Sequence, residues 1–264
     1  GIIAGLSLAM YPLFFGEVHF NVKDPPEMIF FSATVMLLYL AATKVSLIHT
    51  LLAGLTFGLA LATKFNAIFL PLIFLPWFGT YIWQHRSALR GLPAKKKLLL
   101  FFLFPTVLVV GLVILFVSWP YLWRDFPGHI LKILAFYRTI GTVENYQPSY
   151  LFYGFNLYPL IWIIMTTPII VLVLSAAGLV YALRCTKRDS SSLCALLMLW
   201  FLVPVLRVTI PGTSIYGGVR QIMEFLPAIA LLSGIGGSVL LRMFQKRWRY
   251  AGMILFIGLP FVLH

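Results

Sequence analysis

The sequence predicts an all-α fold, a polytopic transmembrane helical bundle, and two observations carry this prediction. Of the 264 residues, 61% are hydrophobic and 10% are charged, with a mean hydropathy of +0.97. A water-soluble globule of this size needs far more polar surface. Apolar stretches close to the roughly 20 residues that cross a bilayer also recur along the chain.

We expect these stretches to form one transmembrane domain over residues 1–264. Gly1 is not an initiator methionine, and the chain both opens and stops in apolar sequence. For this reason we expect the domain to be incomplete at both ends, with no signal peptide to discount.

The charges set the orientation of the bundle. The chain has a net charge of +13, and its basic residues gather in three clusters, Arg86 to Lys97, Arg184 to Arg188 and Arg242 to Arg249. The positive-inside rule places these clusters and Lys44 on the cytoplasmic side. Because this distribution explains the charge, we expect a lipid bilayer and no nucleic acid as partner.

The acidic residues fall on the opposite side in this orientation. Six of the seven lie at or near the outer face: Glu17, Asp24, Glu27, Asp125, Glu144 and Glu224. We therefore expect a multi-pass protein of the plasma membrane or the endoplasmic reticulum, with its working face extracytoplasmic or lumenal.

Taken in order, the apolar stretches give about nine spans, the first and last incomplete. Residues 1–16 rise to the outer face, and after the polar loop 17–24, residues 25–43 descend to an inner turn at 44–49. The stretch 50–83 is too long for one span and is interrupted at Thr63–Asn66. We expect two short helices that meet at the outer face there.

The second half of the chain continues the alternation after a basic loop at 84–97. The expected spans are 98–118, 158–183, 193–206, 221–241 and 250–264. We find no internal repeat, which weakens the case for a transporter built from inverted repeats.

The longest polar segment, 119–157, is expected to be an outer loop that carries an interfacial helix. Trp119, Tyr121 and Trp123 open it as an aromatic belt does. Beyond them, apolar residues recur at the spacing of one helix face, at Ile130, Ile133, Leu134 and Tyr137. The tyrosines farther along could stack on sugar rings or belong to the aromatic belt: Tyr146, Tyr150, Tyr153 and Tyr158.

Candidate site residues begin in the segment Glu17–Pro26, where His19, Lys23 and Asp24 stand between apolar stretches. Charge beside a bilayer is costly and usually functional. Asp24-Pro-Pro-Glu27 also has the pattern of a helix start, with Asp24 as N-cap and Glu27 closing a capping box. The two roles are compatible. His19 and Asp24 could also share a divalent metal, the one cofactor we consider.

Two cations farther along interrupt apolar sequence. Lys64 either extends to the membrane surface or meets an anion such as phosphate, with Thr63 and Asn66 beside it. Arg220 stands four residues before Glu224, which predicts either an internal ion pair or a phosphate contact at the outer mouth. Arg207 is a weaker candidate. We expect Asp24, Lys64 and Arg220 to meet at one outer pocket.

Several soluble-enzyme chemistries have no motif in this chain. Cys185 and Cys194 match no metal-ligand spacing. There is no Walker-type phosphate loop and no Gly-x-Ser-x-Gly motif. These absences favour a substrate delivered through the membrane.

Three segments resemble the GT-C fold glycosyltransferases, specifically the protein O-mannosyltransferase and aminoarabinose transferase-like family. FFGEVHFNVKDPP (14–26) is similar to its second outer loop, GLALATKFNA (58–67) to its Gly-rich span ending in Thr-Lys, and YGGVRQ (216–221), leading to Leu-Pro, to its Gly-x-Arg segment. WPYLW (119–123) also fits. The segments keep the family's order along the chain.

The resemblance implies an inverting transfer of a sugar from a polyprenyl-phosphate donor to a protein, lipid or glycan acceptor. Asp24 matches the second-loop acidic position, which binds metal or places substrate. The family's principal catalytic acid lies in the first outer loop, upstream of Gly1, so this stretch alone is expected to be inactive. Glu17 stands where many relatives carry a second His. The positions assigned to substrate binding are Lys64, Arg220, His19, Lys23 and Tyr216.

Two other functions stay open at this point. A multi-pass transporter or flippase of a lipid-linked or anionic substrate would have Lys64, Arg220 and Glu224 along its path, and ionisable residues deep in several spans. A non-catalytic membrane partner could keep the same fold.

Overall fold

The computed structural model describes residues 1–139, 150–186, 192–213, 215 and 217–243, and this part of the chain is almost entirely helical. It contains twelve α-helices, short 3-10 turns and one small antiparallel hairpin, β1 (Leu151–Phe152) and β2 (Phe155–Asn156). The predicted all-α class is confirmed. The predicted last span at 250–264 and the candidates Glu144, Tyr146 and Tyr216 lie outside the described residues.

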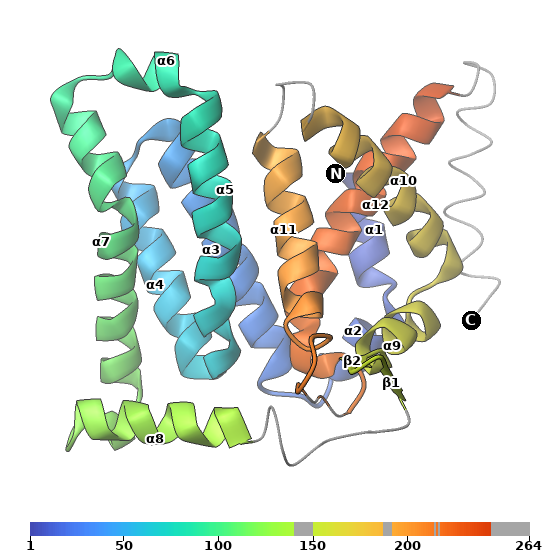
Figure 1. Cartoon of the computed structure of the whole chain (residues 1–264), viewed down its shortest axis with the longest axis horizontal. Coiled ribbons are helices and arrows are strands. Elements are labelled where there is room, and N and C mark those ends of the chain that lie inside the picture. The colour runs from blue at the N-terminus through green and yellow to red at the C-terminus, as the bar shows by residue number, and fades with distance from the viewer. Residues whose placement is uncertain (140–149, 187–191, 214, 216, 244–264) are drawn as a thin grey trace.

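The helices form two groups whose long axes run roughly side by side (Figure 1). In the first group, α4 (Leu47–Thr63) packs against both α3 (Asp24–Lys44) and α7 (Ala94–Ser118). In the second, α12 (Leu226–Met243) packs against α1 (Ile2–Ala9) and α10 (Ile169–Thr186). The two groups meet where α5 (Leu70–Gln84) contacts α11 (Ser192–Leu206).

Several of these helices are long and apolar enough to cross a membrane, which indicates an integral multi-pass membrane protein. By length and hydropathy, the described residues contain four such helices, Asp24–Lys44, Phe65–Gln84, Ala94–Ser118 and Arg220–Met243. A fifth span follows if the bent pair α9 (Tyr158–Thr166) and α10 is one unit. The two short apolar helices α4 and α11 were also predicted as spans. The described residues therefore support four or five spans, fewer than the eight predicted spans that fall among them.

The interruptions of the helices follow from local chemistry. After α3, Val45 adopts a left-handed conformation with φ of 49°, which turns the chain into α4 at the predicted inner turn. At the predicted outer turn, α4 ends at Thr63 and a 3-10 turn, η1 (Phe65–Phe69), leads into α5. Both predicted breaks are confirmed.

Two predicted spans are broken instead of continuous. The segment 158–183 bends by 116° between α9 and α10, because Pro168 follows Thr167 and holds that residue in extended backbone, with ψ of 126°. The segment 1–16 divides into α1 and α2 (Pro12–Glu17), with Pro12 at the first position of the second helix.

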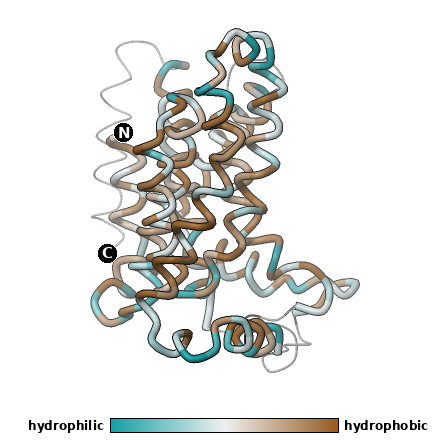
Figure 2. The backbone as a smooth tube through the Cα atoms, turned by 90° about the vertical axis from the view of Figure 1, so that its left-hand side faces the viewer, coloured by the Kyte–Doolittle hydropathy of each residue, from teal (hydrophilic) through white to brown (hydrophobic). Residues whose placement is uncertain are grey.

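Close helix packing in the second group depends on glycine. A Cβ added at Gly236 would lie 1.9 Å from the Leu174 carbonyl oxygen, and one at Gly178 would lie 1.9 Å from that of Leu232. Such small residues let helix backbones approach closely in a membrane, where apolar contact alone gives little driving force. The core that results is apolar, and hydrophilic residues gather at the two ends of the bundle (Figure 2).

At one end, α8 (Phe126–Thr139) lies across the direction of the other helices (Figure 1). The helix predicted from the apolar spacing in the segment 119–157 is therefore present. Ile133 is buried against the bundle, whereas Leu131 and Phe136 are 66% and 59% exposed. Exposed apolar residues on a crosswise helix are typical of an interfacial position. At the opposite end, the short α6 (Arg86–Arg90) connects α5 to α7.

Candidate functional site

A cavity of about 1150 Å³ opens at the end of the molecule where α8 lies. Its walls come from the loop before α3, the α4–α5 junction, α8, the end of α11 and the 3-10 turn η5 (Arg220–Phe225). These segments are far apart in sequence. The cavity therefore exists only because the two helix groups come together.

The cavity combines apolar walls with positive charge. Phe65, Phe69, Leu134 and Leu206 are among its many apolar lining residues. Its charged lining residues comprise one acid, Asp24, and five bases, Lys23, Lys64, Arg138, Arg207 and Arg220. An excess of basic groups beside apolar surface suits an amphiphile with an anionic head.

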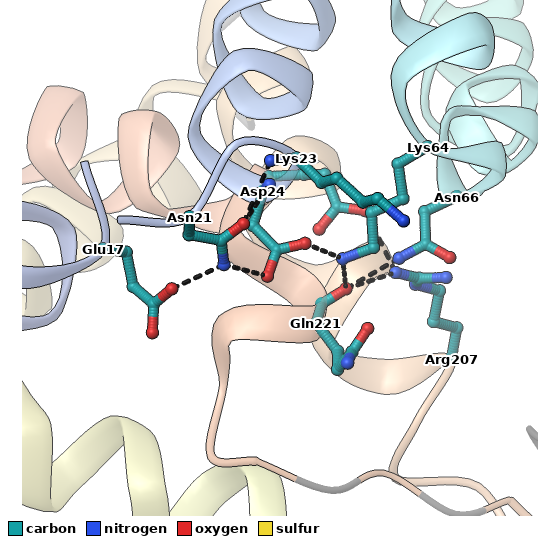
Figure 3. Close-up of polar contacts among 9 residues, drawn as sticks. Glu17, Asn21, Lys23, Asp24, Lys64, Asn66, Arg207 and Gln221 are labelled. Atoms are coloured by element: carbon teal, nitrogen blue, oxygen red, sulfur yellow. Dashed lines mark hydrogen bonds and ion pairs between the residues drawn. The ribbon is translucent and has the colours of Figure 1, made fainter. Parts of the chain in front are cut away.

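Asp24 and Lys64 form a buried ion pair at the edge of this cavity (Figure 3). Lys64 Nζ lies 2.7 Å from Asp24 Oδ1, and the two side chains are 9% and 10% exposed. The other carboxylate oxygen, Oδ2, accepts a hydrogen bond from Asn21 Nδ2 at 2.8 Å. Lys64 thus reaches an anion within the protein, and both oxygens of Asp24 have donors.

The backbone carbonyl of Gln221 gathers donors from three side chains (Figure 3). Asn66 Nδ2 lies 2.7 Å from this oxygen, Lys64 Nζ 3.3 Å and Arg207 Nη2 3.5 Å. Ile222, the next residue, departs from helical geometry, with φ of −126° and ψ of 29°. This break in the helix leaves the Gln221 carbonyl oxygen available to side-chain donors. One oxygen therefore joins the α4–α5 junction to the segment after α11.

Arg207 is the partner of Glu224, so of the two alternatives predicted for Arg220, the internal ion pair with Glu224 is wrong. Arg207 Nη2 lies 3.0 Å from Glu224 Oε1, and the Glu224 side chain is 2% exposed. The Arg207 guanidinium also lies over the Phe69 ring, 4.5 Å from its centroid. Glu224 is positioned in turn by Trp200, whose Nε1 donates to the Glu224 carbonyl oxygen at 2.7 Å.

Arg220 lines the cavity at the start of η5. Its Nε is buried and has no hydrogen-bond partner among the described residues. It packs against Gly217, since a Cβ there would lie 2.7 Å from Nε, and Gly217 itself has φ of +68°. A buried guanidinium N–H without an acceptor is unfavourable, so this arrangement of Arg220 has an energetic cost.

Glu27 is a second buried group with unmet hydrogen-bonding capacity. It is 1% exposed, and its Oε1 has no partner among the described residues. It lies close enough to Glu224, Lys64 and Arg207 to interact with them electrostatically. Together with the ion pairs Lys64–Asp24 and Arg207–Glu224, Glu27 gives this end of the bundle an interior with several buried charged groups.

The predicted capping box at α3 is wrong, because Asn21 replaces it. Neither Asp24 nor Glu27 makes a side-chain cap hydrogen bond. Instead, Asn21 Oδ1 accepts from the backbone N–H groups of Lys23 and Asp24, each at 3.0 Å. Asn21 Nδ2 also bridges Asp24 to the buried Glu17 carboxylate. The Asp24 carboxylate is thereby left to face Lys64.

His19 lies apart from the cavity lining and is exposed. Its Nδ1 is 2.6 Å from the Phe15 carbonyl oxygen, and its ring contacts the Phe15 ring. Among the described residues, no three His, Cys, Asp or Glu side chains gather as metal ligands do. A metal shared by His19 and Asp24 stays a prediction.

The structure thus brings Lys23, Asp24, Lys64 and Arg220 to one cavity. It adds two groups that the sequence patterns did not single out, the Asn21 side chain and the Gln221 carbonyl. It also pairs Glu224 with Arg207 and not with Arg220. The sequence shows that Asn66 stands two residues after Lys64. Nothing in the sequence indicates that both side chains contact the Gln221 carbonyl oxygen.

Comparisons of this chain with protein-family models, with curated proteins and with solved structures found no match.

Proposed function

We propose that this protein is a membrane glycosyltransferase that moves a sugar from a polyprenyl-phosphate donor to an acceptor at the extracytoplasmic or lumenal face. The observation that carries the proposal is the cavity, in which one acid and five bases stand among apolar walls. A polyprenyl phosphate combines the same two features, an anionic head and a long apolar tail. The resemblance of the three segments to GT-C glycosyltransferases supports the same substrate class.

Stabilising the departing phosphate is the task that these residues suit best. In an inverting displacement, negative charge builds up on the lipid phosphate as the bond to the sugar breaks. Arg220 lines the cavity, and its planar guanidinium matches a phosphate oxygen pair. Lys64 stands at the same cavity, held by Asp24 and the Gln221 carbonyl.

Asp24 is suited to positioning and not to proton abstraction. A general base needs a free lone pair aimed at the acceptor hydroxyl. Both Asp24 oxygens already accept hydrogen bonds, from Lys64 and Asn21. We therefore assign Asp24 to holding Lys64, and no general base is assigned among the described residues.

The distribution of charge favours this proposal over a transporter or flippase. In the four long candidate spans among the described residues, Asp, Glu, Lys and Arg occur within about a turn of a helix end. Asp24, Glu27 and Lys44 are such residues in α3. A transport path would place ionisable groups at several depths along the bundle.

The test is transfer by the purified full-length protein in detergent or nanodiscs, with a polyprenyl-phosphate sugar as donor. Arg220→Ala should lower kcat/KM by about 10-fold to 100-fold, the value of a charge-assisted hydrogen bond. Arg220→Lys should recover part of this loss. Arg184→Ala, which removes an exposed arginine near the end of α10, is the matched control and should leave kcat/KM unchanged. Full turnover by Arg220→Ala would remove this arginine from the mechanism.

A further inference from the structure

The end of the bundle opposite the cavity carries a dense group of cations, which we call the basic cap: Arg86, Arg90, Lys95, Lys96 and Lys97. They lie on α6 and the first turn of α7, and all five are exposed. Figure 1 shows α6 at the far end of the helices from α8, and hydrophilic residues mark this end in Figure 2. The basic cap takes no part in the site proposed above.

The protein supplies little negative charge to balance the basic cap. The sequence contains no Asp or Glu from residue 28 through residue 124. Among the described residues, the two ion pairs are Lys64–Asp24 and Arg207–Glu224, both beside the cavity. Five like charges crowded into twelve residues repel one another unless an external anion neutralises them.

The surroundings of the basic cap are those of a bilayer surface. Trp83, at the end of α5, is 69% exposed, and on α7 the side chains of Leu98 and Phe101 are 58% and 75% exposed. The helix α7 is the most apolar of the candidate spans. These side chains place the cations at the depth where hydrocarbon gives way to phosphate headgroups, with an aromatic residue at the boundary.

We propose that the basic cap is a binding surface for anionic phospholipid headgroups of the leaflet on this side. Unpaired cations next to exposed apolar side chains fit a lipid, whose tails cover the apolar surface while its phosphate meets the charge. A soluble polyanion would leave Trp83 and Phe101 uncovered. The basic cap thus anchors the α5–α7 corner of the bundle to acidic lipid.

The experiment measures which lipids the full-length protein retains. Protein from nanodiscs made of equal parts phosphatidylglycerol and phosphatidylcholine is delipidated stepwise, and native mass spectrometry counts the lipids still bound. Wild-type protein should retain phosphatidylglycerol in preference to phosphatidylcholine, and the preference should weaken as salt rises. The triple variant Lys95→Gln, Lys96→Gln and Lys97→Gln should reduce this preference by about tenfold or more.

Two further variants make the result specific. Replacing the same three lysines by arginine keeps the charge and should keep the preference. A matched control, Lys44→Gln with Lys132→Gln and Arg184→Gln, removes three exposed charges scattered over the molecule and should also keep it. If the control variant lost the preference for phosphatidylglycerol equally, the preference would depend on net charge alone and the proposal would be overturned. So would an unchanged preference in the glutamine variant, or equal retention of both lipids by wild type.

Discussion

The ion pair between Asp24 and Lys64 provides the sharpest test of the structure. Its two atoms are 2.7 Å apart and both side chains are about nine-tenths buried. In Lys64→Met, the Asp24 carboxylate would stay buried with Asn21 as its remaining donor. The variant therefore measures the cost of an unpaired buried charge, separately from the loss of apolar packing, because methionine retains most of the side-chain volume.

Removing one member of a buried pair costs about 3–5 kcal/mol. Since Asn21 still donates to Asp24, we expect the lower end, about 3 kcal/mol of unfolding free energy, for Lys64→Met. Asp24→Asn should cost less, about 2 kcal/mol, because Lys64 keeps the Gln221 carbonyl and can turn toward the cavity. The double variant has no unpaired charge, so its loss should be smaller than the sum by about 2 kcal/mol.

The assay is equilibrium unfolding of the full-length protein in mixed micelles, with thermal unfolding as a second measurement. A loss of about 3 kcal/mol corresponds to a fall in Tm of about 6–12 °C for a chain of this size. Lys132→Met, on the exposed side of α8, is the control and should change stability by less than about 0.5 kcal/mol. If the two single losses add without coupling, the side chains are not paired and the site described here is wrong.

Two further predictions concern packing and the start of α3. Gly236→Ala should destabilise the protein by about 2 kcal/mol or more in the same assay, because the added methyl would meet the Leu174 carbonyl oxygen at 1.9 Å. The control is Gly79→Ala, which should be neutral or stabilising because no atom lies within 4 Å of the added methyl. A neutral Gly236→Ala would contradict the close approach of α10 and α12. Asn21→Ala should lower the free energy of unfolding by about 1–2 kcal/mol, since it removes the hydrogen bonds to Lys23, Asp24 and Glu17. It should also speed amide hydrogen exchange in the first turn of α3. Unchanged exchange would show that Asn21 does not hold this turn.

Much of the fold could be predicted from hydropathy and charge, because a bilayer allows few alternatives to helices. The breaks at Val45 and Thr63 follow from polar residues that interrupt apolar sequence. The 116° bend at Pro168 was not predicted, since the apolar composition continues through it and a proline within a span does not by itself indicate how far the helix turns.

The candidate site could be predicted in part. Lys64 and Arg220 stood out because a cation in apolar sequence needs a reason to be there. Their partners did not, because pairing across the tertiary structure leaves no local pattern. The four-residue spacing of Arg220 and Glu224 indicated a pair, yet Arg207, seventeen residues before Glu224, forms it. Asn21 has a weaker chemical signal in the sequence than the charged residues around it.

The carbonyl that receives Asn66, Lys64 and Arg207 belongs to the peptide backbone, and this has a consequence for sequence variation. Exchanging the Gln221 side chain leaves the acceptor in place, so this contact does not restrict the residue type at position 221. The constraint moves to the neighbouring glycines, Gly217 and Gly218, whose φ values of +68° shape the approach to the turn. Around this turn, tolerance to mutation depends on backbone conformation. A comparison of side chains between sequences would not reveal the role of the Gln221 carbonyl oxygen.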